Sequence, residues 1–345
     1  MTILHVLYSN RFSGAENVVC QIIEMFRESP DVRMVYCSPD GQIREALEER
    51  GVEFAPISEL SRAELLRVIA EVRPDVVHAH DMRASFVSAL ACKKIPLISH
   101  IHNNAFDSRG LSPKSLAFLY AAKKAKHIFW VSESAMSGYA FKKSVAKKSD
   151  VLCNIISIDA LYKKMKSDEQ EYSYDLAYVG RLTYPKNPQR LMAVAAKLRE
   201  LKSDVKIAVV GNGDLEEETH ALCREYGLEG NVDFLGFRSN PLKILYSSSA
   251  MVMVSRWEGT PMCALEAMAL GVPIVSTPVD GLKVLIDEGE NGYLSDDDSE
   301  LAEKLFSIIN DRSLRARMSE YTLNKARVIN DVGAYRTRLL EQYKN

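Results

Sequence analysis

Apolar and polar positions alternate in blocks through the first half of the chain. Short apolar runs read ILHVLY, VRMVYCS, VEFAPI and DVVHAH, and amphipathic helices are predicted between them near residues 16–27 and 43–50. The runs IPLISHIH, HIFWVS and DVLCNI continue the series. Strands that alternate with helices are typical of a parallel sheet covered on both faces. The pattern therefore predicts a doubly wound α/β domain.

The same pattern restarts after a polar segment at residues 163–174, KKMKSDEQEYSY. The later runs are DLAYVG, VKIAVVG, NVDFLGF, AMVMVS and GVPIVST, and a helical pattern follows over residues 301–343. We therefore predict two Rossmann-like doubly wound domains that face a central cleft. Their expected bounds are residues 1–165 and 166–330, with a C-terminal helix in residues 331–345.

Composition narrows the classes of function. The 345 residues fit two domains, and 44 Lys and Arg against 46 Asp and Glu give no excess charge for a nucleic-acid partner. The longest stretch without Asp, Glu, Lys or Arg is residues 267–279, which is too short to span a membrane. The six cysteines form no CxxC pair, and Met1 leads directly into the first apolar run. We therefore expect a cytoplasmic protein.

One carboxylate interrupts an otherwise apolar segment. Residues 260–276 read TPMCALEAMALGVPIVS, in which Glu266 is the only charge, and Glu258 stands eight positions earlier. An ionised carboxylate in an apolar interior needs a partner. Gly259 and Pro261 mark a loop that turns into a helix N-terminus, where amides can hold a diphosphate while carboxylates accept hydrogen bonds from ribose and sugar hydroxyls. The arrangement predicts a sugar-nucleotide site.

Two cations follow the first strand of the second half. Arg181 and Lys186 lie in YVGRLTYPKNPQRL, in a loop expected at the carboxyl end of a parallel strand. There they could neutralise a diphosphate leaving group. The alternative is that both are solvated on the surface, although Pro185 and Pro188 fix the loop around Lys186.

Glycines mark two further strand–helix turns. Gly14 in SNRFSGAENVV would let the backbone approach a phosphate, and an ordinary turn is the alternative. Gly211 and Gly213 in VVGNGDLEEETHAL could leave room for a nucleotide, but a third glycine is missing and a tight turn explains them equally well.

Four histidines stand at two strand ends of the first half. His78 and His80 share one face of their strand, and so do His100 and His102, so a metal cluster is one alternative. Neither glutamate nor cysteine joins them at ligand spacing, and we predict no metal site. His102 is expected to reach the cleft, while the other three satisfy hydrogen bonds at strand ends.

Residues 111–150 carry eight lysines against Glu133 and Asp150, interleaved with aromatic and aliphatic residues. Such a segment could rest on an anionic membrane surface. Solvated lysines around core aromatic residues are the alternative.

Taken together, the motifs SGAEN, SHIHNN, VGRL with KN, VVGNGDL, NVDFLGF and EGTPMCALEAMALGVPIV resemble those of the family 4 retaining glycosyltransferases, which have the B-type fold of two Rossmann-like domains. The resemblance spans nearly the whole chain and is strongest over residues 176–292. One departure is that Ser13 precedes Gly14, where the family often has two consecutive glycines.

The resemblance implies a role for each motif. Glu266 would bind the ribose diol, Glu258 the donor sugar, and Arg181 with Lys186 the diphosphate, while His102 would lie beside the reacting sugar. The C-terminal helix would pack back on the first domain, which would bind the acceptor. The implied catalytic residues are His102, Arg181, Lys186 and Glu258, and the implied donor-binding residues are Gly14, Arg181, Lys186, Gly211, Glu258, Gly259, Thr260, Met262 and Glu266.

The expected function is transfer of a hexosyl unit from a nucleoside diphosphate sugar, with UDP or GDP favoured, to an acceptor hydroxyl with retention. No metal or cofactor is implied. The expected acceptor is a saccharide or lipid-linked saccharide in cell-envelope or exopolysaccharide glycan synthesis, with the protein peripheral on the inner face of the cell membrane. The alternatives are a sugar-nucleotide epimerase or hydrolase on the same fold, and a non-catalytic nucleotide-sugar-binding assembly protein.

Overall fold

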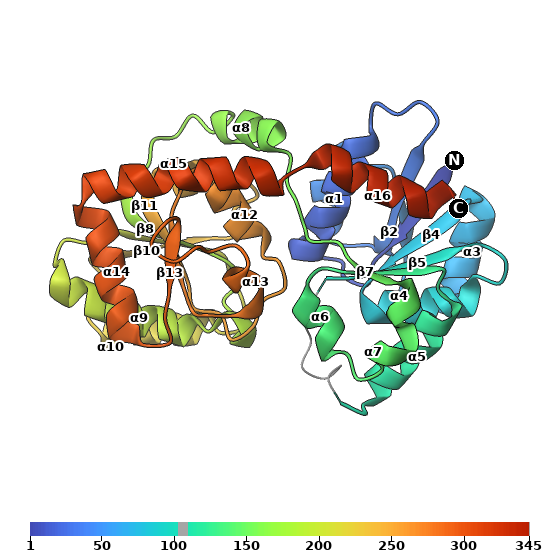
Figure 1. Cartoon of the computed structure of the whole chain (residues 1–345), viewed down its shortest axis with the longest axis horizontal. Helices are drawn as coiled ribbons and strands as arrows, with labels where there is room; N and C mark the ends of the chain where they lie inside the picture. The colour runs from blue at the N-terminus through green and yellow to red at the C-terminus, as the bar shows by residue number, and fades with distance from the viewer. Residues whose placement is uncertain (103–109, 345) are drawn as a thin grey trace. The chain divides into compact units, whose positions relative to one another are not determined.

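A computed structural model describes residues 1–102 and 110–344 of the chain (Figure 1). The chain divides into two compact units. Unit 1 comprises Met1–Ile155 together with Val332–Asn345, and unit 2 comprises Ile156–Asp331. Each unit is built around its own parallel sheet, so the predicted pair of Rossmann-like α/β domains is confirmed.

The sheet of unit 1 has, within the described residues, seven parallel strands in the order β3-β2-β1-β4-β5-β6-β7. The order reverses direction between β1 and β4, which creates the switch point at which such sheets bind ligands. The strands are β1 (Thr2–Val6), β2 (Arg33–Pro39), β3 (Phe54–Ile57), β4 (Val76–His80), β5 (Leu97–Ile101), β6 (His127–Trp130) and β7 (Ser149–Val151).

Helices cover both faces of this sheet (Figure 1). On one face α1 contacts α16, and on the other α4 packs between α3 and α5. The helices are α1 (Gly14–Phe26), α2 (Ile43–Glu48), α3 (Arg62–Val72), α4 (Asp81–Ala91), α5 (Pro113–Lys124), α6 (Glu133–Gly138), α7 (Lys142–Val145) and α16 (Val332–Lys344), with a 3₁₀ helix at Ala146–Lys148.

Unit 2 repeats the architecture with six parallel strands among its described residues, in the order β10-β9-β8-β11-β12-β13. The strands are β8 (Tyr174–Val179), β9 (Ile207–Val210), β10 (Val232–Gly236), β11 (Ser248–Met253), β12 (Ile274–Ser276) and β13 (Gly292–Leu294). The helices are α8 (Ile158–Lys166), α9 (Pro188–Leu201), α10 (Glu216–Glu225), α11 (Leu242–Tyr246), α12 (Met262–Ala269), α13 (Asp280–Lys283), α14 (Asp298–Asn310) and α15 (Arg312–Ile329), with a 3₁₀ helix at Tyr184–Lys186.

The division between the units falls at Ile155 and Ile156, ten residues before the predicted boundary at residue 165. The difference arises because α8 belongs to unit 2, where it contacts α11. Lys164 Nζ donates to the Ser239 carbonyl at 2.7 Å, and Asn240 Nδ2 donates to the Lys164 carbonyl at 2.8 Å. The polar segment at residues 163–174 therefore begins on a packed helix.

The C-terminal helix α16 lies with unit 1 (Figure 1). Lys126 Nζ donates to the carbonyl of Gln342 at 2.5 Å, and Arg338 pairs with Asp150. The ring of Tyr343 packs near Phe26 of α1. Two chain segments far apart in sequence thus share one hydrophobic layer.

Among the described residues, none of the helices combines the length and the apolar character that crossing a membrane requires.

Candidate functional site

Unit 2 brings together two groups that the sequence keeps 72 positions apart. Lys186 ends the 3₁₀ helix after β8, and Glu258 lies in the loop between β11 and α12. Because β8 and β11 are parallel neighbours, the loops at their carboxyl ends meet. Lys186 Nζ stands 2.5 Å from Glu258 Oε1, with side chains 19% and 9% exposed. The result is a largely buried ion pair at the end of the sheet where doubly wound domains bind ligands.

Hydrogen bonds hold the carboxylate of Glu258 and its loop in place. Ser255 Oγ donates to Glu258 Oε1 at 2.6 Å, and Thr277 Oγ1 donates to the carbonyl of Ser255 at 2.8 Å. The same carboxylate oxygen therefore receives both a lysine ammonium and a serine hydroxyl. The role of Ser255 was not predicted, although its position three residues before Glu258 in SRWE places it in the same loop.

One backbone and one side-chain hydrogen bond tie the loop of Lys186 to the loop of Glu258. The N–H of Arg256 donates to the carbonyl of Pro185, and Arg256 Nη2 donates to Asn187 Oδ1, each at 2.8 Å. Asn187 has φ +56°, in the left-handed region that asparagine tolerates better than most residues. Two hydrogen bonds thus connect the two loops that carry the ion pair.

The Glu258 carboxylate keeps the side chain of Lys186 in its charged form. Burial by itself lowers the pKa of Lys186, but the Glu258 carboxylate outweighs it, so the pKa lies above its ordinary value. Burial also raises the pKa of the nearby Cys263 thiol to about 12. At neutral pH the site therefore presents a charged lysine and a neutral thiol.

The loop after Glu258 turns into α12, whose N-cap position is Pro261. Thr260 and Met262 are each 8% exposed, and Glu266 is half-buried on this helix and interacts with neighbouring groups. A side chain at Gly281 would place its Cβ 1.3 Å from the Gly259 carbonyl oxygen. Gly281, which the sequence reading missed, is thus what allows α13 to approach the loop.

The glycines after β9 have a structural explanation. Gly211 has φ +138°, and a Cβ there would lie 2.0 Å from the carbonyl oxygen of Gly180. A Cβ on Gly213 would lie 2.1 Å from the carbonyl oxygen of Leu182. Close approach to the loop that carries the exposed Arg181 requires both glycines. The tight-turn alternative therefore accounts for them without a ligand.

Gly14 differs from these glycines. It opens α1, and a Cβ built on it would meet no atom of the described residues within 4 Å. Ser13 Oγ donates to Glu16 Oε2 at 2.5 Å just beside it. Packing among the residues that the structure describes thus does not require glycine at this position, which is compatible with a ligand approaching the turn.

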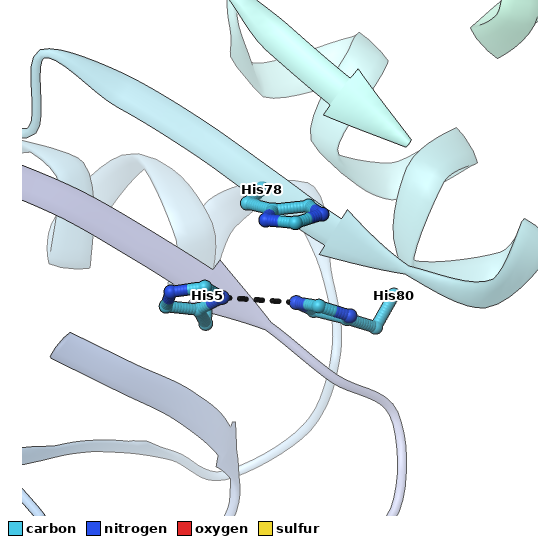
Figure 2. A group of neighbouring side chains, drawn as sticks. All are labelled: His5, His78 and His80. Carbon is cyan, nitrogen blue, oxygen red and sulfur yellow. Dashed lines mark hydrogen bonds between the residues drawn. The ribbon is translucent and has the colours of Figure 1, made fainter. Parts of the chain in front are cut away.

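Unit 1 contains a cluster of five buried or partly buried histidines at the carboxyl ends of β1, β4 and β5. His5 lies opposite His78 in the β1–β4 register, and His80 lies opposite His100 in the β4–β5 register. Figure 2 shows His5 and His80 facing each other through ring nitrogens, with His78 close to both. The sequence analysis did not include His5, whose neighbours in the cluster come from other strands.

Hydrogen bonds connect three members of this cluster in a chain. His5 Nδ1 lies 3.0 Å from His80 Nε2, and His80 Nδ1 lies 2.8 Å from His102 Nε2. His78 Nδ1 lies 2.8 Å from the Tyr343 hydroxyl of α16. The expected strand-end hydrogen bonds are thus present for His78 and His80. The ring nitrogens of His100 have no hydrogen-bond partner among the described residues.

The cluster also has the composition of a metal site. In each of two triads, His5 with His78 and His80, and His80 with His100 and His102, one nitrogen per residue lies within 4.8 Å of the others. However, His80 stacks on His78 with ring centroids 4.3 Å apart, and both of its nitrogens already face other histidines. Stacked rings do not direct their lone pairs at a common point, so hydrogen bonding describes this arrangement better than coordination.

Burial keeps the histidines of the cluster neutral. It lowers the pKa of His5 and of His102 to about 3. Burial, followed by repulsion from neighbouring histidines, holds the pKa values of His78, His80 and His100 well below the ordinary value.

The basic segment at residues 111–150 divides into core and surface. Its aromatic residues Phe118, Phe129, Trp130 and Tyr139 are at most 1% exposed. Leu111, Leu116 and Tyr120 are 82%, 53% and 40% exposed. Four aromatic side chains of this segment thus belong to the core, as the alternative interpretation expects. Leu111, Leu116 and Tyr120 leave apolar groups on the surface at and near α5.

Each of the two units matches a known family model. Residues 12–160 match the family model described as Glycosyltransferase Family 4, and residues 162–325 match that of Glycosyl transferases group 1. A solved structure of HepE from Anabaena with UDP-glucose has a TM-score of 0.87, with 22% identity over 99% of this chain and 98% of that chain. The two units therefore form the B-type glycosyltransferase fold.

Proteins similar to this chain in sequence are also named as glycosyltransferases. An uncharacterized glycosyltransferase of Methanocaldococcus jannaschii is 30% identical over 62% of this chain, and the match spans 58% of that relative's length. A UDP-Gal:α-D-GlcNAc-diphosphoundecaprenol α-1,3-galactosyltransferase of Escherichia coli is 24% identical over 85% of this chain and 83% of its own. The chain belongs to the family 4 glycosyltransferases.

Proposed function

We propose that the protein transfers a hexosyl unit from a nucleoside diphosphate sugar to an acceptor hydroxyl, with retention at the anomeric carbon. The observation that carries this proposal is the Lys186–Glu258 pair, held at the carboxyl ends of β8 and β11 beside the N-terminus of α12. A cation and a helix N-terminus favour a diphosphate, and a fixed carboxylate favours sugar hydroxyls.

In this proposal each group has a defined task. The departing diphosphate accumulates negative charge in the transition state, and Arg181 with Lys186 stabilises it. The backbone around Gly259, Thr260 and Met262 supplies amides to the same phosphates. The remaining donor contacts are Glu266 to the ribose hydroxyls, Glu258 to the sugar, and Gly14 and His102 through the family resemblance. Gly211 is also proposed as a donor contact, in addition to its role in the close packing against Gly180.

The leaving diphosphate can itself accept the proton of the acceptor hydroxyl, so the proposal requires no separate base. Charge stabilisation by Arg181 and Lys186 would perform the task that a metal ion performs in other transferases. We therefore propose that the reaction needs no metal cofactor, and activity in the presence of a strong chelator tests this.

We propose a UDP or GDP sugar as donor and a saccharide or lipid-linked saccharide as acceptor, in cell-envelope or exopolysaccharide glycan synthesis. Two relatives support the proposal: HepE was solved with UDP-glucose, and the Escherichia coli relative is named for UDP-Gal and a diphosphoundecaprenol acceptor. A cytoplasmic protein acting at the inner face of the membrane would meet both substrates.

A panel of UDP, GDP, ADP and CMP sugars tests the donor by thermal shift, because a ligand that binds only the folded state raises the melting temperature. One class of nucleotide should raise it, and no shift with any of them would contradict the proposal. NMR of the product then reads the anomeric configuration. Rapid conversion of the donor without an acceptor would favour an epimerase or hydrolase instead.

The membrane contact is tested separately. Within residues 111–150, Leu116 and Tyr120 are exposed, and so are the lysines at 123, 143 and 147. We expect sedimentation with anionic vesicles, and we expect changing these three lysines to glutamate to abolish it. Lys148 is left unchanged because its Nζ donates to the carbonyls of Lys123 and Ala125. Sedimentation unaffected in the variant, or absent in the intact protein, would contradict a membrane contact.

A further inference from the structure

The main chain of Arg181 is held at the end of β8 by a side chain of that strand. The hydroxyl of Tyr178 donates to the carbonyl of Arg181 at 3.1 Å. The N–H of Thr183 donates to the same carbonyl at 3.0 Å. Tyr178 is 2% exposed, and its ring belongs to the hydrophobic core of unit 2. The loop of Arg181 is therefore anchored to a side chain that the core holds in place.

Gly180 leaves room for this hydrogen bond. Residues two apart in an extended chain point to the same face, so a side chain at Gly180 would stand beside that of Tyr178. A Cβ on Gly180 would lie 3.2 Å from the Tyr178 hydroxyl oxygen, which is tighter than ordinary van der Waals contact. The absence of a side chain at this position thus lets the hydroxyl extend past Gly180 and reach Arg181.

Both neighbours of Arg181 are held by the loop that follows β9. The N–H of Gly180 donates to the carbonyl of Val210 at 3.0 Å. The N–H of Leu182 donates to the carbonyl of Asn212 at 2.9 Å. The main chain is therefore fixed on either side of Arg181, and the tyrosine hydroxyl supplies a contact at Arg181 itself.

Arg181 differs from the other cation of the site in its partners. Lys186 is paired with the carboxylate of Glu258, and that pair carries no net charge. The side chain of Arg181 is exposed and has no hydrogen-bond or ion-pair partner among the residues that the structure describes. A guanidinium offers five N–H donors in one plane, which suits two phosphate oxygens at once. Of the two cations, Arg181 is thus the one whose donors remain available to a phosphate.

We propose that Tyr178 is a positioning residue for phosphate binding: its hydroxyl fixes the main chain of Arg181, from which the guanidinium reaches the diphosphate of the nucleotide. The identity of this ligand rests on the proposed function. Burial, followed by the nearby Cys263 and Glu258, raises the pKa of the Tyr178 hydroxyl well above its ordinary value. The hydroxyl therefore stays protonated at neutral pH and remains a donor to the carbonyl of Arg181.

Amide hydrogen exchange of the unliganded full-length protein tests the anchor itself. Tyr178→Phe keeps the ring in the core and removes only the hydroxyl. Because the loop loses an anchor, the N–H of Thr183 should exchange about 5-fold faster, the scale of one hydrogen bond. The matched control is Tyr174→Phe on the same strand, whose hydroxyl donates to Asp233 Oδ2 at 3.1 Å and which should leave Thr183 unchanged. Unchanged exchange at Thr183 in folded Tyr178→Phe would overturn the proposal.

Binding titrations separate the phosphates from the rest of the nucleotide. The probes are UDP and GDP, with uridine and guanosine titrated by NMR as the phosphate-free counterparts. For the nucleotide that the parent binds, Tyr178→Phe should weaken diphosphate binding by about 5-fold and leave nucleoside binding unchanged. Tyr174→Phe should change neither. Equal weakening of diphosphate and nucleoside in Tyr178→Phe would indicate a general loosening of unit 2 and would overturn a role in phosphate binding.

A double-variant cycle tests whether the tyrosine acts through the arginine. Arg181→Ala should weaken diphosphate binding by about 30-fold, the scale of losing hydrogen bonds from a charged donor. Adding Tyr178→Phe to Arg181→Ala should weaken it no further, because the guanidinium that the hydroxyl positions is already absent. Losses that add in the double variant would show that Tyr178 acts elsewhere, contrary to the proposal.

The proposed function and the role of Tyr178 fail in different ways. Absence of binding by any nucleoside diphosphate in the parent would overturn both. Binding in the parent, with the same diphosphate affinity in Tyr178→Phe, would overturn only the role of Tyr178.

Discussion

At the scale of single residues, the proposed chemistry depends on the charge of Lys186. Its Nζ is fixed 2.5 Å from Glu258, so the cation is in place before any ligand binds. Lys186→Ala should reduce kcat by about 100-fold or more, the scale of losing one preorganised charge stabiliser. The control is Lys202→Ala: this lysine is also 19% exposed and paired with an aspartate at 2.6 Å, but it precedes β9 at the other end of the strands. Equal kcat in the two variants would contradict the assignment.

Glu258 should affect stability as well as activity. Glu258→Gln leaves the largely buried ammonium of Lys186 without its counter-charge, and we expect a loss of about 3 kcal/mol in the free energy of unfolding. Adding Lys186→Met in the same chain removes the unpaired charge and should recover most of that loss. Urea denaturation of the two variants measures both effects. A double variant less stable than Glu258→Gln alone would show that the pair does not account for the loss.

At the scale of elements, α16 offers a comparison within one helix. The hydroxyl of Tyr343 bonds His78, whereas the hydroxyl of Tyr335 is buried without a partner among the described residues. Both tyrosines are 4% exposed. Tyr343→Phe should therefore cost about 1 kcal/mol, and Tyr335→Phe should be neutral or slightly stabilising. Thermal or urea unfolding compares them, and the reverse order would refute the assigned contact.

The buried histidines at the strand ends of unit 1 should make the stability of this unit fall in mild acid. A histidine whose pKa is lowered by folding binds its proton first in the unfolded chain, so stability is lost as pH falls below the ordinary value of 6.5. His5, with a pKa of about 3, should contribute a loss of about 1 kcal/mol between pH 7.5 and 5.5.

Urea unfolding in a Trp257→Phe background measures this loss, because Trp130 of unit 1 is then the only tryptophan. His5→Phe should reduce the pH-dependent loss in the free energy of unfolding by about 1 kcal/mol. His220→Phe in unit 2 should leave this loss unchanged. The same dependence in His5→Phe and in the parent would rule out a buried neutral His5.

At the scale of the whole molecule, the sequence was sufficient for the fold class because buried parallel strands have nearly continuous apolar runs. The runs at DLAYVG and AMVMVS coincide with β8 and β11, and their neighbouring positions in the sheet explain why Lys186 meets Glu258. The family resemblance pointed to the same residues from their motifs.

Other features required coordinates. The place of α8 in unit 2 depends on its packing against α11 and not on its polar composition. Gly281 and Ser255 act through contacts with residues of other elements or their own loop, for which the sequence has no pattern. His5 was missed because its neighbours in the cluster come from other strands.

The most direct measurement of the central claim is a binding comparison at Glu266 by calorimetry. It uses the nucleoside diphosphate that stabilises the protein most and the 2′,3′-dideoxy form of that nucleotide. The intact protein should bind the ribonucleotide at least about 10-fold more tightly than the dideoxy form, because the carboxylate accepts hydrogen bonds from the ribose diol. Glu266→Ala should bind both equally and weakly. Undiminished discrimination in Glu266→Ala would contradict a sugar-nucleotide site built on this carboxylate.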